Sequence, residues 1–185
     1  DLQRIRSAAD RMQHLLGELL ELSRIGRMVN PDADVPLFEL IDGIIERRRD
    51  SFDPEKSQIE IDANLPVVVG DGQRIDKAFS VLIDNAIMYA SKTHPIKLEI
   101  GVRRDPGEAV VYVRDNGIGI RPDNIRRIFD LCVRFSDRPG GAGIGLTIAQ
   151  RIIEYHGGRM WAESPGEGKG ATLFATFPDA RCRFD

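Results

Sequence analysis

The sequence predicts an α/β fold, a two-layer sandwich in which a sheet has helices on one face and water on the other, preceded by a long amphipathic helix. Two stretches alternate apolar residues with a period of two, as strands with one buried face do. These residues are Ile59, Ile61 and Ala63 in the first stretch and Leu173, Ala175 and Phe177 in the second. In segments 79–90 and 146–153 the apolar residues instead recur at intervals of three and four, which predicts helices.

The elements are expected in an order that mixes strands and helices. We expect strands at residues 35–37, 58–63, 67–69, 96–104, 109–114, 159–163 and 171–176. We expect helices at residues 2–28, 38–51, 71–90, 123–129 and 144–156. A length of 185 residues fits one core-bearing domain plus one helix better than two full domains.

The first expected helix has a heptad seam. Its apolar residues lie three and four apart, and Arg, Gln and Glu fill the other faces. The seam consists of Ile5, Ala8, Met12, Leu15, Leu19 and Leu22. The polar stretch 30–34 separates this helix from the rest of the chain, which favours a separate helical segment over a helix packed on its own domain.

Asp115 follows the apolar, β-rich run 109–113, so its carboxylate is expected where a strand leaves the sheet and faces a cleft. An ionised Asp only accepts hydrogen bonds. It can accept one from the exocyclic amine of adenine, whereas guanine has a carbonyl oxygen at that position and would oppose two acceptors. The residue therefore predicts an adenine site.

Two glycine clusters flank a segment of few apolar residues. Gly117 and Gly119 lack a Cβ, so the backbone can turn sharply and let a flat base approach. Gly143 and Gly145 lead into an apolar-periodic helix, whose first N–H groups and positive dipole end suit a polyphosphate. A lone glycine triplet is more often a turn, but the two clusters together with Asp115 predict a nucleotide pocket with a mobile lid at 120–142.

Asn85 interrupts an otherwise apolar helical run. A buried Asn requires a partner for its amide, so one interpretation is a core Asn that caps a neighbouring loop. Beside a nucleotide, its carbonyl oxygen is instead a suitable Mg²⁺ ligand that shares the ion with phosphate oxygens and water.

Several short motifs, taken in their order along the chain, resemble those of the catalytic and ATP-binding domain of sensor histidine kinases. The motifs are Asn85-Ala86, Asp115-x-Gly117-x-Gly119, Ile128-Phe129, Gly141-x-Gly143-x-Gly145-Leu146, His156-Gly157-Gly158, Gly168-Lys169-Gly170-Ala171-Thr172 and Phe177-Pro178. The resemblance implies the Bergerat-type ATP-binding fold, with a mixed and largely antiparallel sheet, as in gyrase, the related heat-shock chaperones and mismatch-repair ATPases. It also implies the second helix of a dimerisation and phosphotransfer hairpin at 1–29, a linker at 30–34, the ATP-binding domain at 35–180 and a tail at 181–185.

The resemblance implies a function and a site. Such a domain binds Mg²⁺-ATP and transfers the γ-phosphoryl group to a histidine, for relay to an aspartate of a response-regulator receiver domain. Asn85 matches the Mg²⁺ ligand, Asp115 matches the residue that reads adenine, and no residue of this chain is assigned as catalytic. The implied ATP-binding residues are Asn85, Tyr89, Asp115, Gly117, Gly119, Ile120, Arg134, Arg138, Gly141, Gly143, Gly145, Leu146 and Thr172. The implied partners are an upstream phosphoacceptor helix, a second copy joined through the N-terminal hairpin, and a response regulator.

None of the histidines fits the family's phosphoacceptor, which is followed by Asp or Glu. His14, His94 and His156 are followed by Leu, Pro and Gly. We expect His14 on the outer side of the first helix, His94 in a loop, and His156 as a cation at the C-terminal end of a helix. The phosphoacceptor is therefore expected upstream of the chain, in a longer protein.

Two residues depart from the family pattern. Val81 stands where many relatives have a second Asn, and Met88 where they often have Lys. These departures leave open a degenerate nucleotide-binding scaffold without catalysis. A serine kinase of the anti-sigma-factor type also remains open because it shares the glycine boxes, although such kinases lack the hairpin. Val81 has no proton-accepting atom that could activate water, so transfer to a side chain is favoured over hydrolysis.

Composition sets further limits. A formal net charge of −3 without a long basic block argues against nucleic-acid binding, and we interpret Arg47-Arg48-Arg49 as a solvated helix end. Cys132 and Cys182 lack the spacing of metal ligands and are expected to be free thiols. No apolar stretch reaches ~18 residues. We expect a soluble, cytoplasmic piece, with membrane attachment of the longer protein left open.

Overall fold

The computed structural model describes residues 30–105, 108–131, 133 and 143–178, together with residues 6, 9, 12, 13, 16, 17, 20, 23 and 25. The strands are β1 (Ala33–Pro36), β2 (Gln58–Ile61), β3 (Val67–Gly70), β4 (Lys97–Asp105), β5 (Glu108–Asp115), β6 (Met160–Glu163) and β7 (Ala171–Phe177). The α-helices are α2 (Leu37–Arg47), α3 (Gly72–Met88) and α4 (Gly145–Tyr155). Short 3₁₀ turns occur at η1 (Arg49–Ser51), η2 (Pro122–Asn124) and η3 (Arg127–Phe129).

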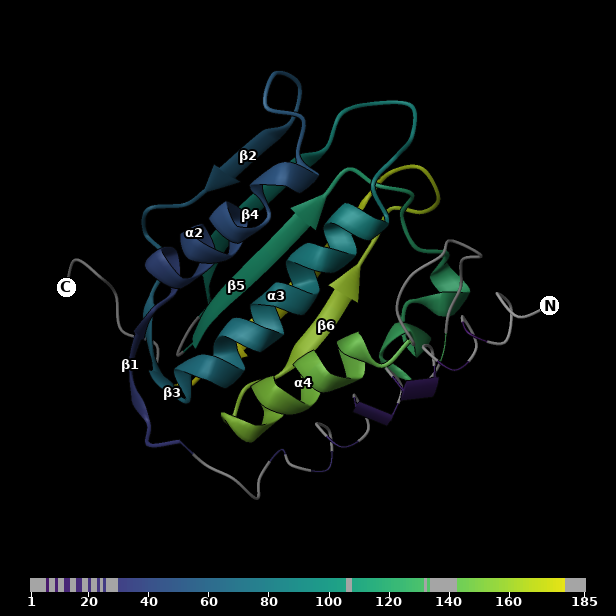
Figure 1. Cartoon of the computed structure of the whole chain (residues 1–185). Helices are drawn as coiled ribbons and strands as arrows, with labels where there is room; N and C mark the ends of the chain where they lie inside the picture. The colour runs from purple at the N-terminus through teal and green to yellow at the C-terminus, as the bar shows by residue number, and fades with distance from the viewer. Residues whose placement is uncertain are drawn as a thin grey trace.

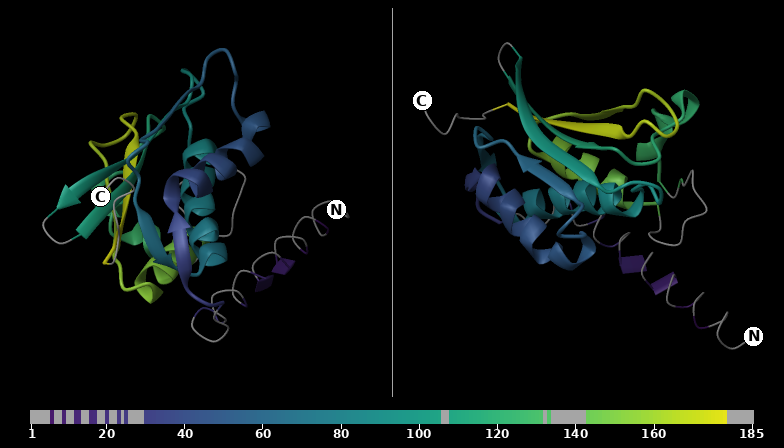
Figure 2. Two further views of the ribbon diagram at one scale, coloured as in Figure 1. Left: turned by 90° about the vertical axis from the view of Figure 1, so that its left-hand side faces the viewer. Right: turned by 90° about the horizontal axis from the view of Figure 1, so that it is seen from above.

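The main sheet has five strands in the order β2-β4-β5-β7-β6. β2 pairs with β4 in parallel, and the remaining pairs are antiparallel. Helices α2, α3 and α4 lie on one face of this sheet (Figures 1 and 2). A separate antiparallel pair, β1 with β3, lies beside the helices. This arrangement confirms the predicted two-layer α/β sandwich with a mixed, largely antiparallel sheet.

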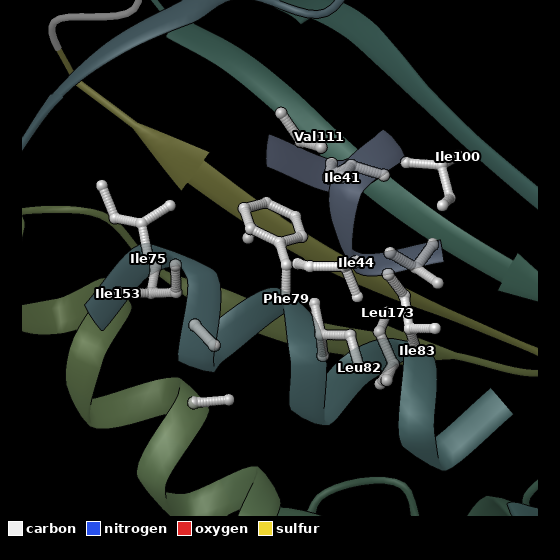
Figure 3. Packing of buried hydrophobic residues seen from close by; sticks show 14 of the residues in the cluster. Ile41, Ile44, Ile75, Phe79, Leu82, Ile83, Ile100, Val111, Ile153 and Leu173 are labelled. Atoms are coloured by element: carbon white, nitrogen blue, oxygen red, sulfur yellow. The ribbon is translucent and has the colours of Figure 1, made fainter. Parts of the chain in front are cut away.

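Helix α3 supplies the centre of the hydrophobic core. Its buried apolar residues recur at intervals of three and four, so they form one stripe: Ile75, Ala78, Phe79, Leu82, Ile83 and Ala86. Phe79 is fully buried and stacks on Phe177 of β7, with ring centroids 6.3 Å apart. Figure 3 shows how Phe79 points between the helices and the sheet. Burial of a side chain of this size stabilises the fold by ~2–3 kcal/mol.

The sheet face opposite the helices carries aromatic rings covered by arginines. Trp161 stacks on Phe174 with centroids 4.9 Å apart, and the Arg103 guanidinium lies 5.6 Å from the Phe174 centroid. Phe174 is therefore only 5% exposed although no described helix covers it. This face was predicted to meet water. In the structure, the side chains of Arg103 and Trp161 lie between Phe174 and the solvent.

The N-terminus of α3 is capped by Asp71, which is fully buried. Its Oδ1 accepts hydrogen bonds from the amides of Gln73 and Arg74 at 3.1 and 3.3 Å. The Asn30 side chain donates to Asp71 Oδ2 at 3.1 Å. The segment that precedes β1 is therefore attached to the start of α3.

His156 differs from our expectation of a cation. Its Nε2 accepts a hydrogen bond from the backbone amide of Asp71 at 3.0 Å, and its Nδ1 lies 2.7 Å from the Ile152 carbonyl oxygen. An imidazole that accepts at Nε2 and donates at Nδ1 is neutral. The prediction was wrong because the end of α4 meets the start of α3, which the local sequence does not reveal.

Three further differences concern local structure. Residues 123–129 form η2 and η3 rather than the predicted α-helix, since a segment of this length does not repay helix nucleation. β1 begins at residue 33, inside the predicted linker. The side chain of Arg48 is not a solvated helix end: it pairs with Asp84 through both carboxylate oxygens, one at 2.8 Å, and links α2 to α3.

Some predictions fall mainly outside the described residues. In the predicted helix at 2–28, the described residues from Arg6 to Ser23 are helical. His14, Cys132, Cys182 and the tail at 181–185 lie outside the described ranges, as does most of the heptad seam. Among the residues that the structure describes, no helix has the length and hydropathy of a membrane span.

Replacing Asp71 by Ala should lower the free energy of unfolding by about 2–4 kcal/mol, since several buried donors lose their acceptor. Burial raises the pKa of Asp71, but hydrogen bonds from Asn30 and from the amides of Arg74 and Gln73 outweigh it and hold the pKa below its ordinary value. The stabilisation is therefore complete above the unfolded-state pKa and is lost as pH falls through the lower folded-state pKa.

Urea unfolding of the wild type and Asp71→Ala from neutral to strongly acidic pH measures this difference. Asp42→Ala, at an exposed position of α2, is the control and should change stability little. A gap between wild type and Asp71→Ala that stays constant down to the lowest pH would contradict the assignment.

Candidate functional site

Asp115 is the last residue of β5, where it pairs with Leu98 of β4 and Ala171 of β7. Its Oδ1 accepts hydrogen bonds from the amides of Gly117 at 2.7 Å and Ala171 at 3.3 Å. Its Oδ2 accepts no hydrogen bond from any described residue. Burial raises the pKa of this carboxyl above its ordinary value, and the two amides only partly offset that effect. The site thus holds a partly buried carboxylate with one oxygen fixed and the other open.

The loop after Asp115 is in close backbone contact with the loop between β6 and β7. The amide of Gly168 donates to the Ile118 carbonyl oxygen at 2.7 Å, and the amide of Gly170 donates to that of Gly117 at 3.1 Å. A Cβ at Gly119 would overlap the Gly166 carbonyl oxygen, and the residue has φ +70°. Side chains are therefore excluded from this contact.

Asn85 lies in the last turn of α3 and Tyr89 is its C-cap residue, next to the same loop. The Tyr89 carbonyl oxygen accepts a hydrogen bond from the Ile118 amide at 3.0 Å. Asn85 is one turn earlier and shares a helix face with Val81, which packs against Gly145 at the start of α4. Asn85 therefore lies between the two glycine clusters.

The side chain of Asn85 makes no hydrogen bond to another described residue. The alternative of a core Asn that caps a loop has no such bond to support it. In the described part of the chain, no three His, Cys, Asp or Glu residues are grouped to hold a metal. An ion at Asn85 would therefore need oxygen ligands from a bound molecule and water.

Helix α4 begins at Gly145, directly after the second glycine cluster, and Gly143 has φ +76°. The first amides of a helix have no intrahelical acceptor, so those at 145–147 are available to an anion. The Thr147 hydroxyl donates to the Phe129 carbonyl oxygen at 2.9 Å. The predicted lid at 120–142 is therefore attached to α4 at η3, and its later part lies outside the described residues.

The structure brings together most of the predicted site residues that it describes. Those around the loop after Asp115 and the start of α4 are Asn85, Tyr89, Asp115, Gly117, Gly119, Ile120, Gly143, Gly145 and Leu146. Arg134, Arg138 and Gly141 lie outside the described residues.

The side chain of Thr172 lies on the sheet face opposite the helices. It pairs with Arg114 of β5, and the Arg114 Nε donates to its hydroxyl at 3.4 Å. Its neighbour Leu173 faces the helices with the core, so the Thr172 side chain points to the opposite face. Thr172 as an ATP-binding residue stays a prediction, and Ala171 is the β7 residue opposite Asp115.

Sequence reasoning missed two residues at the site. Ala171 donates its amide to Asp115, and the alternation of β7 was a signal that could have identified it. Ser164 donates and accepts hydrogen bonds between the two loops, and no periodic pattern marks a serine in a loop.

A separate surface hollow lies beside the site. Residues of the loop after α2 and of the loop before β4 line it, among them Lys56, Lys92 and His94. The Asn116 side chain donates to the carbonyl oxygen of Pro95, a lining residue, at 2.9 Å. Since neither Asp115 nor Asn85 lines this hollow, we do not assign the nucleotide to it.

Asp115→Asn should raise the stability of the nucleotide-free protein at neutral pH. Asn keeps an oxygen for the two amides but removes the partly buried charge. Because the pKa of Asp115 is raised in the folded state, protonation stabilises the wild type, and its deficit relative to Asp115→Asn should shrink as pH falls through that pKa. Denaturant titrations at several pH values measure the gap. A variant less stable than the wild type at neutral pH would show that the ionised Asp115 carboxylate does not destabilise the folded protein.

The chain is similar to proteins of one family. The model of the family described as histidine kinase-, DNA gyrase B- and HSP90-like ATPases matches residues 70–181. The methanogenesis regulatory histidine kinase FilI from Methanothrix harundinacea is 37% identical over 179 residues, which are 96% of this chain and 20% of that protein. The chain thus spans about a fifth of the length of this curated relative.

Solved structures show the same fold. Full-length ShkA in complex with AMPPNP has a TM-score of 0.75 at 24% identity, covering 97% of this chain and 38% of that one. The catalytic domain of histidine kinase ThkA has a TM-score of 0.64 at 25% identity, covering 80% of this chain and 98% of that one. The chain therefore belongs to the histidine kinase-, DNA gyrase B- and HSP90-like ATPase family, and it matches the catalytic ATP-binding domains of sensor histidine kinases in sequence and fold.

Proposed function

We propose that the chain is the catalytic part of a sensor histidine kinase, which binds Mg²⁺-ATP and transfers its γ-phosphoryl group to a histidine on an upstream helix. The observation that carries the proposal is the Asp115 carboxylate, with Oδ1 fixed by two amides and Oδ2 open beside the glycine loop. Similarity to a named histidine kinase over 96% of the chain supports it. The AMPPNP bound to ShkA supports an adenine nucleotide as the ligand.

Asp115 and the glycine loop select the base in this proposal. The open Oδ2 accepts a hydrogen bond from the adenine amine, while guanine would place a carbonyl oxygen against it. The absence of side chains at Gly117 and Gly119 leaves the backbone open to a flat ring. Tyr89 and Ile120 lie at the glycine loop and Leu146 at the start of α4, and all three would contact the nucleotide.

Asn85 and the start of α4 bind the phosphates. The side chain of Asn85 has no partner among the described residues and lies between the base end and Gly145, so it fits a Mg²⁺ ligand. The ion would neutralise part of the phosphate charge. The amides at 145–147 would hold phosphate oxygens, with Arg134, Arg138 and Gly141 as further candidates.

The acceptor is proposed to be a histidine on the first helix of the hairpin. The attack of its imidazole nitrogen on the γ-phosphorus breaks the bond to the bridging oxygen and releases ADP, and a response-regulator aspartate then takes the phosphoryl group. Met12, Leu16 and Leu20 are exposed and spaced four apart in the N-terminal helix, which supports packing against a hairpin partner and a second copy. A cytoplasmic location is part of the same proposal.

A nucleotide-binding scaffold without catalysis is the second candidate. Val81, where relatives have an amide, packs its methyl groups towards Gly145 and offers the metal no oxygen. The two candidates agree on nucleotide binding and differ on phosphoryl transfer.

The chain should bind Mg²⁺-ATP at least about fivefold more tightly than Mg²⁺-GTP, because an opposed pair of buried acceptors costs ~1–3 kcal/mol. Asp115→Ala should remove most of this preference. Isothermal titration of both nucleotides measures it, with Asp105→Ala in β4 as a control that keeps the preference. Equal affinities in the wild type would contradict the assignment of Asp115.

With γ-labelled ATP, the chain should stay unlabelled by itself and label a separately supplied hairpin that carries the upstream histidine. Asn85→Ala should slow the labelling at least about tenfold through loss of the metal ligand. Asp84→Ala is the matched control, since the neighbouring side chain pairs with Arg48 on another face of α3. Tight Mg²⁺-ATP binding without label on any authentic hairpin would favour the scaffold, and label on His14, His94 or His156 would refute an upstream acceptor.

A further inference from the structure

Ser164 lies where β6 ends, and its hydroxyl uses its full hydrogen-bonding capacity. Oγ accepts from the amides of Ile120 at 3.0 Å and Gly166 at 3.2 Å. It donates its proton to the Gly170 carbonyl oxygen at 2.7 Å. A hydroxyl has one proton and two lone pairs, so the side chain is fixed from three directions.

These bonds join the loop after Asp115 to the loop between β6 and β7 at Ile120, where no backbone hydrogen bond between described residues connects the two loops. The backbone bonds between the loops end at Gly117 and Ile118, and Ser164 adds the contact at Ile120. Ile120 is the residue at which the chain leaves the glycine loop for η2 and η3. The far end of that segment is held independently, by Thr147 at Phe129.

Ser164 therefore holds the loop after Asp115 at Ile120, where the chain turns towards η2. Without the hydroxyl, the Ile120 amide and the Gly170 carbonyl oxygen lose their shared partner. Gly117 and Gly119 then allow the loop after Asp115 other conformations beyond Ile118, since Gly restricts the backbone least. In the conformation with the loop packed on Gly166–Gly170, the amides of Gly117 and Ala171 hold Asp115 Oδ1 and Oδ2 stays open.

We propose that Ser164 is a positioning residue for the nucleotide base: its hydroxyl holds the first glycine loop in the conformation that accepts adenine. The inference rests on the proposed function and adds to it a residue that acts through Ile120 and Gly170 rather than by touching the nucleotide. Loss of the Ser164 hydroxyl would lower the fraction of molecules whose loop can bind the base. The apparent affinity for the nucleotide would fall in proportion to that fraction.

The test is the affinity of Ser164→Ala for adenosine and for Mg²⁺-ATP, measured by isothermal titration at a temperature where each variant is folded. Both affinities should fall by a similar factor of about tenfold, because both ligands carry the base and the population applies to each. Ser164→Thr keeps the hydroxyl and should bind within about twofold of the wild type. Ser51→Ala, the same change at an exposed position of η1, should leave both affinities unchanged.

The outcomes separate a positioning role from a structural one. If Ser164→Ala does not fold, Ser164→Cys has nearly the same volume and only a weak donor and acceptor, and it carries the same test. A folded variant without the hydroxyl that binds adenosine like the wild type overturns the inference and leaves the proposed function intact. A loss confined to Mg²⁺-ATP, or a failure of Ser164→Thr to restore binding, also overturns it. A wild type that binds no adenine nucleotide overturns the proposed function and this inference with it.

Discussion

The close approach of two backbones at the ends of β5 and β7 is the constraint on which the site depends. Gly170 lies so near Asp115 that a Cβ there would overlap the Asp115 carbonyl oxygen, and Gly117 meets the Tyr89 carbonyl oxygen in the same way. This proximity lets the Ala171 amide reach Asp115 Oδ1 at 3.3 Å. One carboxylate oxygen is thereby occupied, and the open one has a defined direction. A larger residue at Gly170 would separate the two backbones, and one at Gly117 would push its loop away from the end of α3.

Helix α3 links this site to the rest of the fold. At its start, Asp71 receives hydrogen bonds from the helix amides and from Asn30, while its own amide donates to His156 of the α4 end. At its other end, Asn85 and Tyr89 face the glycine loops. The same helix buries Phe79 and its neighbours in the core. The position of the candidate metal ligand is therefore set by the packing of the whole domain, as a preorganised site requires.

The sequence predicts much of this site, for reasons that differ between residues. Asp115 and Asn85 are polar residues that interrupt apolar patterns, and the glycines indicate where two backbone segments approach closely. Both signals can be recognised from a few neighbouring residues in the sequence. The face of Thr172 was also predictable, since Leu173, Ala175 and Phe177 set the alternation of β7 and leave Thr172 on the other side.

Other contacts depend on residues far apart in the chain. The neutral state of His156 follows from Asp71, which is 85 residues away, and the role of Ser164 follows from Ile120, which is 44 residues away. The pairing of Arg48 with Asp84 likewise needs the packing of α2 on α3. No periodicity encodes these pairs, so only the assembled fold reveals them. The two 3₁₀ turns at 122–129 are a further case, because they are held by α4 through Thr147 rather than by their own helix propensity.

A crystal structure of the chain with Mg²⁺ and a non-hydrolysable ATP analogue would test the central claim most directly. The account predicts the adenine amine within hydrogen-bonding distance, ~2.7–3.2 Å, of Asp115 Oδ2. It also predicts that the Gly117 and Ala171 amides remain on Oδ1 and that the Asn85 side-chain oxygen coordinates the ion. A base bound elsewhere, or an Asp115 that turns away from the two amides to reach it, would contradict the claim that this loop contact builds the nucleotide site.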